Sequence, residues 1–109
     1  MIDNLDSIFD LKNKIIVITG ASGLLGRMHA EAVAAYGGIP VLLDLNMNNL
    51  ILVKEKILEK YNISSALYEV NITNESQVEN SAKEVFKEFG RIDGLINNAA
   101  NNPKIEDSS

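Results

Sequence analysis

Thr19-Gly20-Ala21-Ser22-Gly23-Leu24-Leu25-Gly26 is the stretch that decides the fold, because it joins a buried strand to an amphipathic helix. The residues before it, 14–19, read Lys-Ile-Ile-Val-Ile-Thr, which is typical of a strand covered on both faces of a parallel sheet. A helix is predicted over 24–36, and Gly37-Gly38 ends it. The glycines of the loop permit a sharp turn, a close approach of the backbone to a ligand, and tight packing of the helix. The unpaired N–H groups at the start of the helix favour an anionic ligand group such as a phosphate.

The rest of the chain continues the alternation of strands and helices. Further strands are predicted at 39–44, 66–70 and 92–96. Residues 46–49 offer the N-cap of one helix, and Asn74, which with Gln77 resembles a capping box, offers the N-cap of another. Such alternation with short loops predicts right-handed crossovers and a parallel sheet. We therefore expect an α/β fold with three layers and the strand order 3-2-1-4, in which the third strand is an edge and the fourth leaves a bare apolar edge.

Each predicted helix carries apolar residues at helical spacing, which we expect to face the sheet. They are Leu25, Met28, Ala32 and Ala35 in the first helix, Leu50, Val53, Ile57 and Leu58 in the second, and Val78, Ala82, Val85, Phe86 and Phe89 in the third.

Composition excludes several classes of function. The 109 residues, 46% hydrophobic and 23% charged, are typical of one soluble globular domain. A net charge of −5 without any basic run argues against nucleic-acid binding. The chain has no cysteine and one histidine, His29, so we expect no metal site and no cysteine nucleophile. No apolar stretch approaches the roughly 20 residues of a membrane span, and the first residues do not read as a signal peptide, so we expect a cytoplasmic protein without membrane contact.

Asp44 closes the second predicted strand, 24 positions after Gly20 and 18 after Gly26. An acidic residue at about this spacing after a glycine-rich turn accepts hydrogen bonds from the ribose hydroxyls of a dinucleotide. The sequence therefore predicts dinucleotide binding. It also favours NAD over NADP, because a carboxylate repels a 2′-phosphate and no Arg or Lys stands at positions 45–49.

The complete pattern resembles the N-terminal half of a short-chain dehydrogenase/reductase, over residues 12–103. The matching motifs are Thr19-Gly20 with Gly26, Asp44, Asn71-Ile72-Thr73, the stretch from Gly90 to Ile96, and Asn97-Asn98-Ala99-Ala100. The resemblance implies a Rossmann sheet that is truncated after the fourth strand. We expect a single partial dinucleotide-binding domain over 1–109, with its core at 12–100 and an irregular tail at 101–109.

The resemblance also implies a role for individual residues. The loop would hold the pyrophosphate and the adenosine ribose, Asn71 and Ile72 would border the adenine, Asn97 would brace the fourth strand, and the residues after it would lie along the cofactor. The implied cofactor-binding residues are Gly20, Ser22, Gly23, Leu24, Leu25, Gly26, Asp44, Asn71, Ile72, Asn98, Ala99 and Ala100.

Three residues depart from the pattern of the family. Leu24 stands where the family usually has its middle glycine, and Gly23 lies one position earlier, as in the extended branch that includes nucleotide-sugar epimerases. Asn71 replaces the usual aspartate, so that an amide oxygen without charge would meet the adenine amino group. Ala100 replaces a glycine.

The family's catalytic Tyr-x-x-x-Lys pair is absent from these residues. Tyr36, Tyr61 and Tyr68 are followed four positions later by proline, serine and isoleucine, so we expect no catalytic residue in this chain. The sequence is consistent with the NAD(P)-binding portion of an oxidoreductase that transfers a hydride to or from a carbonyl or alcohol in the complete enzyme. It is also consistent with a non-catalytic NAD-binding or docking module, and with a fragment of an extended-type sugar-nucleotide epimerase or dehydratase. The sequence is also compatible with a homo-oligomer of the complete protein.

Overall fold

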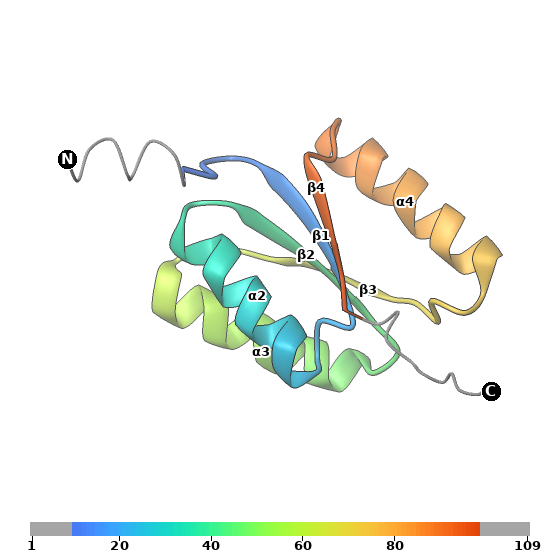
Figure 1. Cartoon of the computed structure of the whole chain (residues 1–109), viewed down its shortest axis with the longest axis horizontal. Helices are drawn as coiled ribbons and strands as arrows, with labels where there is room; N and C mark the ends of the chain where they lie inside the picture. Colours follow the sequence, from blue (N-terminus) through green and yellow to red (C-terminus); the bar gives the residue numbers. More distant parts are fainter. Residues whose placement is uncertain (1–9, 99–109) are drawn as a thin grey trace, which may run out of the picture.

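The chain forms a parallel sheet with helices on both faces, as shown by a computed structural model that describes residues 10–98 (Figure 1). In chain order the elements are β1 (Ile15–Thr19), α2 (Leu24–Ala35), β2 (Ile39–Asp44), α3 (Met47–Tyr61), β3 (Ala66–Glu69), α4 (Glu75–Phe89) and β4 (Gly94–Asn97). The strand order is β3-β2-β1-β4, and every neighbouring pair is parallel. The predicted fold class and strand order are therefore confirmed, whereas the predicted tail at 101–109 lies outside the described residues.

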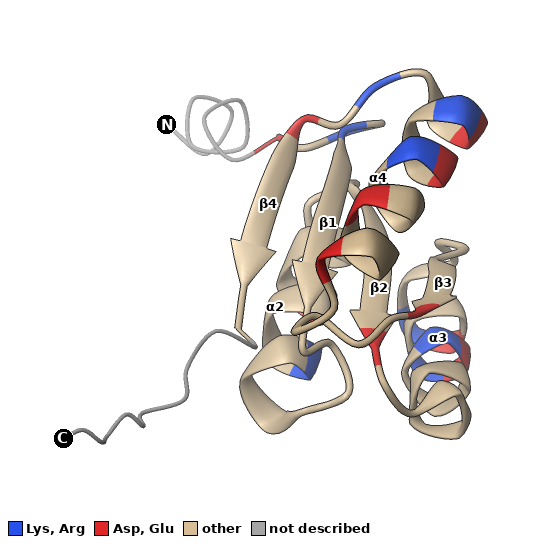
Figure 2. Cartoon of the chain, turned by 90° about the vertical axis from the view of Figure 1, so that its right-hand side faces the viewer, with Lys and Arg blue, Asp and Glu red and all other residues tan. Residues whose placement is uncertain are grey.

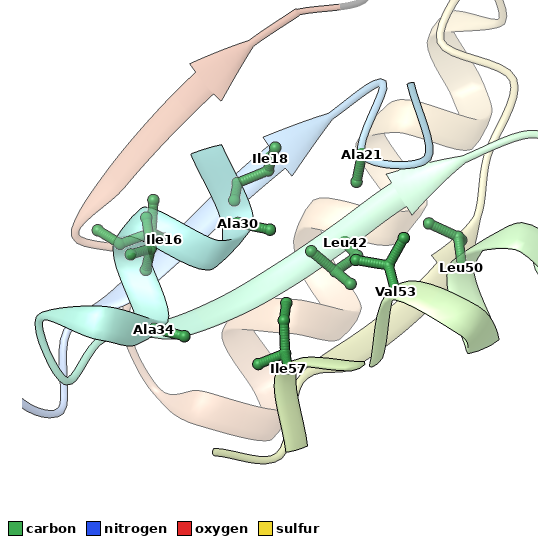
Figure 3. Packing of buried hydrophobic residues seen from close by; sticks show 10 residues of the cluster. Ile16, Ile18, Ala21, Ala30, Ala34, Leu42, Leu50, Val53 and Ile57 are labelled. Carbon is green, nitrogen blue, oxygen red and sulfur yellow. The ribbon is translucent and has the colours of Figure 1, made fainter. Parts of the chain in front are cut away.

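The sheet separates two apolar layers because its side chains alternate between its faces. Ile16 and Ile18 of β1 pack with residues of α2 and α3, whereas Ile15 and Val17 pack on the opposite face with Val85 of α4. Figure 3 shows the larger layer, in which the strand residues meet alanines of α2 and the branched side chains of α3. Both faces of the central strands are thus buried, as their continuous apolar sequence predicts.

Asparagines cap the two later helices, as expected. The Oδ1 of Asn46 accepts a hydrogen bond from the N–H of Asn49 at 3.1 Å, and the Oδ1 of Asn74 accepts one from the N–H of Gln77, also at 3.1 Å. The expected capping box is only half formed. The Oε1 of Gln77 accepts from the N–H of Asn71 at 2.8 Å, because the N–H of Asn74 already donates to the carbonyl of Asn71 at 2.9 Å.

The face of α2 that packs on the sheet differs from the predicted face. Leu25 is 61% exposed and Met28 is 57% exposed, and Ala32 and Ala35 are exposed as well. The buried residues of this helix are Gly26, Ala30, Val33 and Ala34. The prediction was wrong because it assigned the larger side chains to the core, whereas α2 packs at Gly26 directly on the backbone of the glycine loop and buries mainly small residues.

The predicted faces of α3 and α4 were too wide. Leu58 is 46% exposed and Phe86 is 58% exposed, although both were expected to face the sheet, and Ala82 is exposed as well. Each helix presents only a narrow strip to the single sheet face beneath it, so residues one position beyond the strip reach solvent. For α4 this strip is centred on Ser81 and Val85.

Both outer strands match their predicted places at the edges of the four-stranded sheet. β3 carries half-buried residues and ends in the exposed Glu69, and Leu95 of β4 is 63% exposed. Charged residues lie mainly on the helices and at the strand ends, while the bodies of the strands carry none (Figure 2).

Candidate functional site

The residues predicted to bind a ligand gather at one edge of the sheet. All four strands run in the same direction (Figure 2), so their carboxyl ends lie together. The glycine loop follows β1, Asp44 is the last residue of β2, Asn71 follows β3, and Asn98 follows β4. Open parallel sheets bind ligands in the crevice outside the carboxyl ends of their strands, on either side of the first strand.

The glycine loop requires glycine at two positions for two different reasons. Gly20 has a φ of 65°, a left-handed conformation that side chains with a Cβ rarely adopt. A Cβ at Gly26 would lie 2.0 Å from the carbonyl oxygen of Gly20 and 2.8 Å from the Cα of Ala21, so α2 packs directly on the backbone of the loop. Ala21 is fully buried, and its N–H donates to the carbonyl of Leu43 at 3.2 Å. The turn is therefore held against β2.

The start of α2 offers free hydrogen-bond donors. Gly23 is its N-cap and provides no side-chain cap, unlike the asparagines of α3 and α4. The N–H of Gly23 donates to the carbonyl of Gly20, and the first intrahelical bond runs from the N–H of Arg27 to the carbonyl of Gly23. No acceptor within residues 10–98 takes the N–H groups of Leu24, Leu25 and Gly26. Three backbone donors at the positive end of the helix dipole fit a diphosphate.

Asp44 connects β2 to the glycine loop. Its Oδ2 accepts hydrogen bonds from the N–H of Ser22 at 2.9 Å and from the Oγ of Ser22 at 2.6 Å. Its Oδ1 accepts from the N–H of Leu45 at 2.7 Å. The sequence predicted Asp44 and Ser22 as parts of one site but gave no sign of this contact, because the two residues lie 22 positions apart and meet only through the pairing of β1 with β2.

On the side of β3, the side chain of Asn71 is engaged within its own turn. Its Oδ1 accepts hydrogen bonds from the N–H of Thr73 at 3.0 Å and from the Oγ1 of Thr73 at 2.7 Å. This oxygen was the atom expected to meet the adenine amino group, and both of its usual acceptor positions are taken. Ile72 is half-buried and lines an apolar cavity of about 290 Å³ between α4 and the sheet, together with Thr19 and Val78.

On the side of β4, the ends of two strands are tied together by Thr19. Its Oγ1 donates to the Oδ1 of Asn97 at 2.7 Å, and its carbonyl oxygen accepts from both the N–H and the Nδ2 of Asn98, each at 3.3 Å. Asn98 therefore joins Asn97 in bracing β4 against β1. Ala99 and Ala100, which were also predicted to contact a cofactor, lie outside the described residues.

Ionisable groups elsewhere form structural contacts. Tyr68 donates to the Oε1 of Glu88 at 2.6 Å, and burial of the phenol, together with this neighbouring carboxylate, raises the pKa of Tyr68 to about 12. In the described part of the chain, no three His, Asp or Glu side chains gather closely enough to share a metal ion. The helices between residues 10 and 98 include none with the length and apolar character to cross a membrane. The expected cytoplasmic location stays a prediction.

The parallel sheet and the glycine turn define a nucleotide-binding fold of the Rossmann type. The model of the short chain dehydrogenase family matches residues 14–108. The sorbose reductase of Candida albicans is 34% identical over 96 residues, which cover 88% of this chain and 34% of that protein. The 15-hydroxyprostaglandin dehydrogenase [NAD(+)] of Macaca fascicularis is 31% identical over 96 residues, which cover 86% of this chain and 36% of that protein.

Solved structures give the same result. The L-sorbose reductase of Gluconobacter frateurii, complexed with NADPH and L-sorbose, matches with a TM-score of 0.81 and 28% identity, covering 85% of this chain and 35% of that one. The chain therefore belongs to the short-chain dehydrogenase/reductase family. It spans about a third of the length of the curated relatives it matches.

Proposed function

We propose that this chain is the cofactor-binding part of an oxidoreductase that passes a hydride between a nicotinamide dinucleotide and a carbonyl or alcohol carbon. The observation that carries the proposal is the contact of Asp44 with the glycine loop. It holds the carboxylate that would accept from the ribose hydroxyls close to the backbone N–H groups that would donate to the diphosphate, at the carboxyl ends of β1 and β2. Membership of the short-chain dehydrogenase/reductase family supports the hydride-transfer chemistry.

Each part of the cofactor then has a set of residues to hold it. The turn of Gly20 and Gly23 and the N–H groups of Leu24, Leu25 and Gly26 would hold the diphosphate, and Ser22 and Asp44 the adenosine ribose. Asn71 and Ile72 would border the adenine, and Asn98, Ala99 and Ala100 would lie along the rest of the cofactor. When bound, the nicotinamide ring supplies the hydride chemistry. The 109 residues hold no Tyr-x-x-x-Lys pair, so we assign them binding and orientation and no proton transfer.

We further propose that the preferred cofactor is NAD. The carboxylate of Asp44 would lie beside the 2′-position of the ribose, where its charge opposes that of a 2′-phosphate. No Arg or Lys follows it at positions 45–49 to offset that repulsion. Relatives of this chain include a dehydrogenase named for NAD(+) and a reductase solved with NADPH, so the family contains both preferences.

Calorimetric titration of the full chain with NAD and with NADP tests the proposal. We expect NAD to bind at least about tenfold more tightly than NADP, and Asp44→Ala to weaken NAD binding about tenfold or more, because a charged hydrogen-bond partner is lost. Glu69→Ala is the matched control. Glu69 is exposed and lies on β3 in register with Asp44, and its replacement by alanine removes the same charge. If neither NAD nor NADP binds, or if the Asp44→Ala variant binds NAD as tightly as the parent chain does, the proposal is contradicted.

A further inference from the structure

The outer side of β3 presents unpaired backbone groups. β3 is the last strand of the sheet, and within residues 10–98 no strand pairs with its outer side. The N–H of Val70 donates to the carbonyl of Asp44, so the backbone of Val70 points toward β2. Because successive residues of a strand turn their backbone groups to opposite sides, those of Tyr68 also face β2, and those of Leu67 and Glu69 face outward. An exposed strand edge of this kind is a template on which a further strand can pair.

A groove of about 620 Å³ lies along this edge. Its lining includes the first three residues of β3 and Ile39 at the start of β2, so it lies toward the end of the sheet opposite the glycine loop. Ser65 also lines the groove, is only 3% exposed, and has an Oγ without a hydrogen-bond partner among the described residues. Buried hydroxyl groups are normally hydrogen-bonded, so this orphaned oxygen indicates a ligand that completes the groove.

The two walls of the groove differ in character, because α3 and α4 pack on opposite faces of the sheet. On the side of α4, the exposed Glu84 and Glu88 line the groove. On the side of α3, Lys54 lines it, and Ile51 and Leu58 lie one helical turn to either side of Lys54. Ile51 is 40% exposed and Leu58 is 46% exposed. One wall is therefore acidic, and the other offers apolar surface.

The carboxylates of the acidic wall are available to a cation. Neither Glu84 nor Glu88 forms an ion pair with a basic side chain of residues 10–98. The phenol of Tyr68 donates to the Oε1 of Glu88 at 2.6 Å. Burial, this hydrogen bond and the charges of Glu88 and Glu84 together raise the pKa of Tyr68 to about 12. The phenol therefore stays protonated at neutral pH, and both carboxylates keep accepting positions and negative charge for a ligand.

We propose that the edge of β3 binds an extended segment of a partner protein in which basic residues alternate with apolar ones. The segment would pair with the backbone of Leu67 and Glu69, as in other cases where a peptide adds a strand to a sheet. Because successive side chains of a strand point to opposite faces, every second one would lie beside the acidic wall. Lys or Arg fits these positions, and apolar side chains fit the positions beside Ile51 and Leu58.

Charge distinguishes this occupant from two others. A second copy of the chain, paired antiparallel through β3, would place its α4 beside the first α4, so that the carboxylates of both acidic walls would face each other. The terminal segments 1–9 and 101–109 each contain more acidic than basic residues. Both alternatives therefore match the acidic wall less well than a basic segment does.

A labelled heptapeptide that alternates valine with lysine tests the proposal in fluorescence anisotropy titrations with the full chain. We expect it to bind at least about tenfold more tightly than a heptapeptide that alternates valine with glutamate, and binding should weaken as salt is added. The double variant Glu84→Gln/Glu88→Gln should bind the lysine peptide about tenfold more weakly. Glu55→Gln/Glu59→Gln removes two exposed carboxylates at the same spacing on α3 and should leave the affinity unchanged.

Hydrogen exchange followed by NMR shows where the peptide binds. The amides of Leu67 and Glu69 should exchange at least about tenfold more slowly with the lysine peptide bound, whereas the amide of Tyr68, which faces β2, should change little. If the two amides are already protected without peptide, in a dimer detected by sedimentation, the edge belongs to a second copy and the proposal is overturned. It is also overturned if the lysine peptide does not bind, if both peptides bind equally, or if binding leaves the two amides unprotected.

Discussion

Replacement of Gly26 by alanine is expected to force α2 away from the glycine loop. The new Cβ would lie 2.0 Å from the carbonyl oxygen of Gly20, whereas real Cβ atoms essentially never come within 3.0 Å of such an atom. The neighbouring Cα of Ala21, at 2.8 Å, blocks a small sideways shift. All of these neighbours are backbone atoms, so no side chain can rotate out of the way. The helix and the loop must separate by about 1 Å at this point.

This forced separation lowers the free energy of unfolding. Overpacking a rigid site costs about 1–3 kcal/mol, and a clash with backbone belongs at the upper end of this range. The higher helix propensity of alanine offsets about 1 kcal/mol of this loss in stability. We therefore expect Gly26→Ala to lower the free energy of unfolding by about 2 kcal/mol, which corresponds to a fall in Tm of roughly 10 °C for a domain of this size.

Urea and thermal unfolding followed by circular dichroism measure this change. Gly23→Ala is the matched control in the same loop, because its φ is −77° and its new Cβ would lie 3.5 Å from the carbonyl oxygen of Gly20, an ordinary contact. Its expected effect is no more than about 1 kcal/mol, the cost of a poorer N-cap. A Gly26→Ala variant as stable as the Gly23→Ala variant would refute the close packing of α2 on the loop.

Three further predictions concern parts of the fold outside the loop. Asn74→Ala removes the side-chain cap of α4 and should lower the free energy of unfolding by about 1 kcal/mol in urea titrations. The hydrogen bonds of Arg91 and of a backbone N–H lower the pKa of Asp93 below its usual value, so the stability that this contact gives is complete above about pH 4 and is lost as the pH falls further. The difference in stability between the parent and Arg91→Ala should accordingly shrink on acidification, and a constant difference would contradict this reading. Because the pKa of Tyr68 is raised to about 12 in the folded chain, its ultraviolet phenolate absorbance should appear well above the usual pH of 10, and the stability linked to Tyr68 should fall as the pH rises from about 10 to 12. Glu88→Gln should move that absorbance change to lower pH.

The strands and the helix caps could be predicted from the sequence because their signals are local. The second strand was predicted at 39–44 and is observed at Ile39–Asp44, where continuous apolar residues lie between a glycine pair and a helix cap. Asn74 was predicted as a cap for the same reason, and Asn46 lies within the predicted capping stretch 46–49, since a capping side chain binds a backbone group three residues away.

The buried face of α2 could not be predicted in this way. Helical spacing gives several candidate faces for α2. The prediction chose the face with leucine and methionine, which fits only if the helix and the sheet lie at an ordinary distance from each other. Here the separation is set by Gly26, and the residues that fit beneath the helix are small ones such as Ala30 and Ala34. Large apolar side chains at the start of the helix are left exposed as a consequence.

The candidate site shows a similar division. The glycine turn and Asp44 were predicted as parts of the candidate site from spacing alone, because each has a characteristic place relative to a strand end. The bonds between Asp44 and Ser22, and the use of the Asn71 side chain within its own turn, depend on how the strand ends meet in space. Such side-chain hydrogen bonds determine how many acceptor positions stay open for a ligand. That number cannot be predicted from the residue types alone.

We propose that the first N–H groups of α2 bind the diphosphate of a nicotinamide dinucleotide. Two-dimensional ¹H–¹⁵N NMR of the full chain, titrated with NAD, shows which backbone amides respond to the cofactor. We expect the largest shifts at the amides of Ser22, Leu24, Leu25 and Gly26, with small changes in the amides of α4. Shifts that gather along α4 or β3, with the amides of the glycine loop unchanged at saturating NAD, would contradict it.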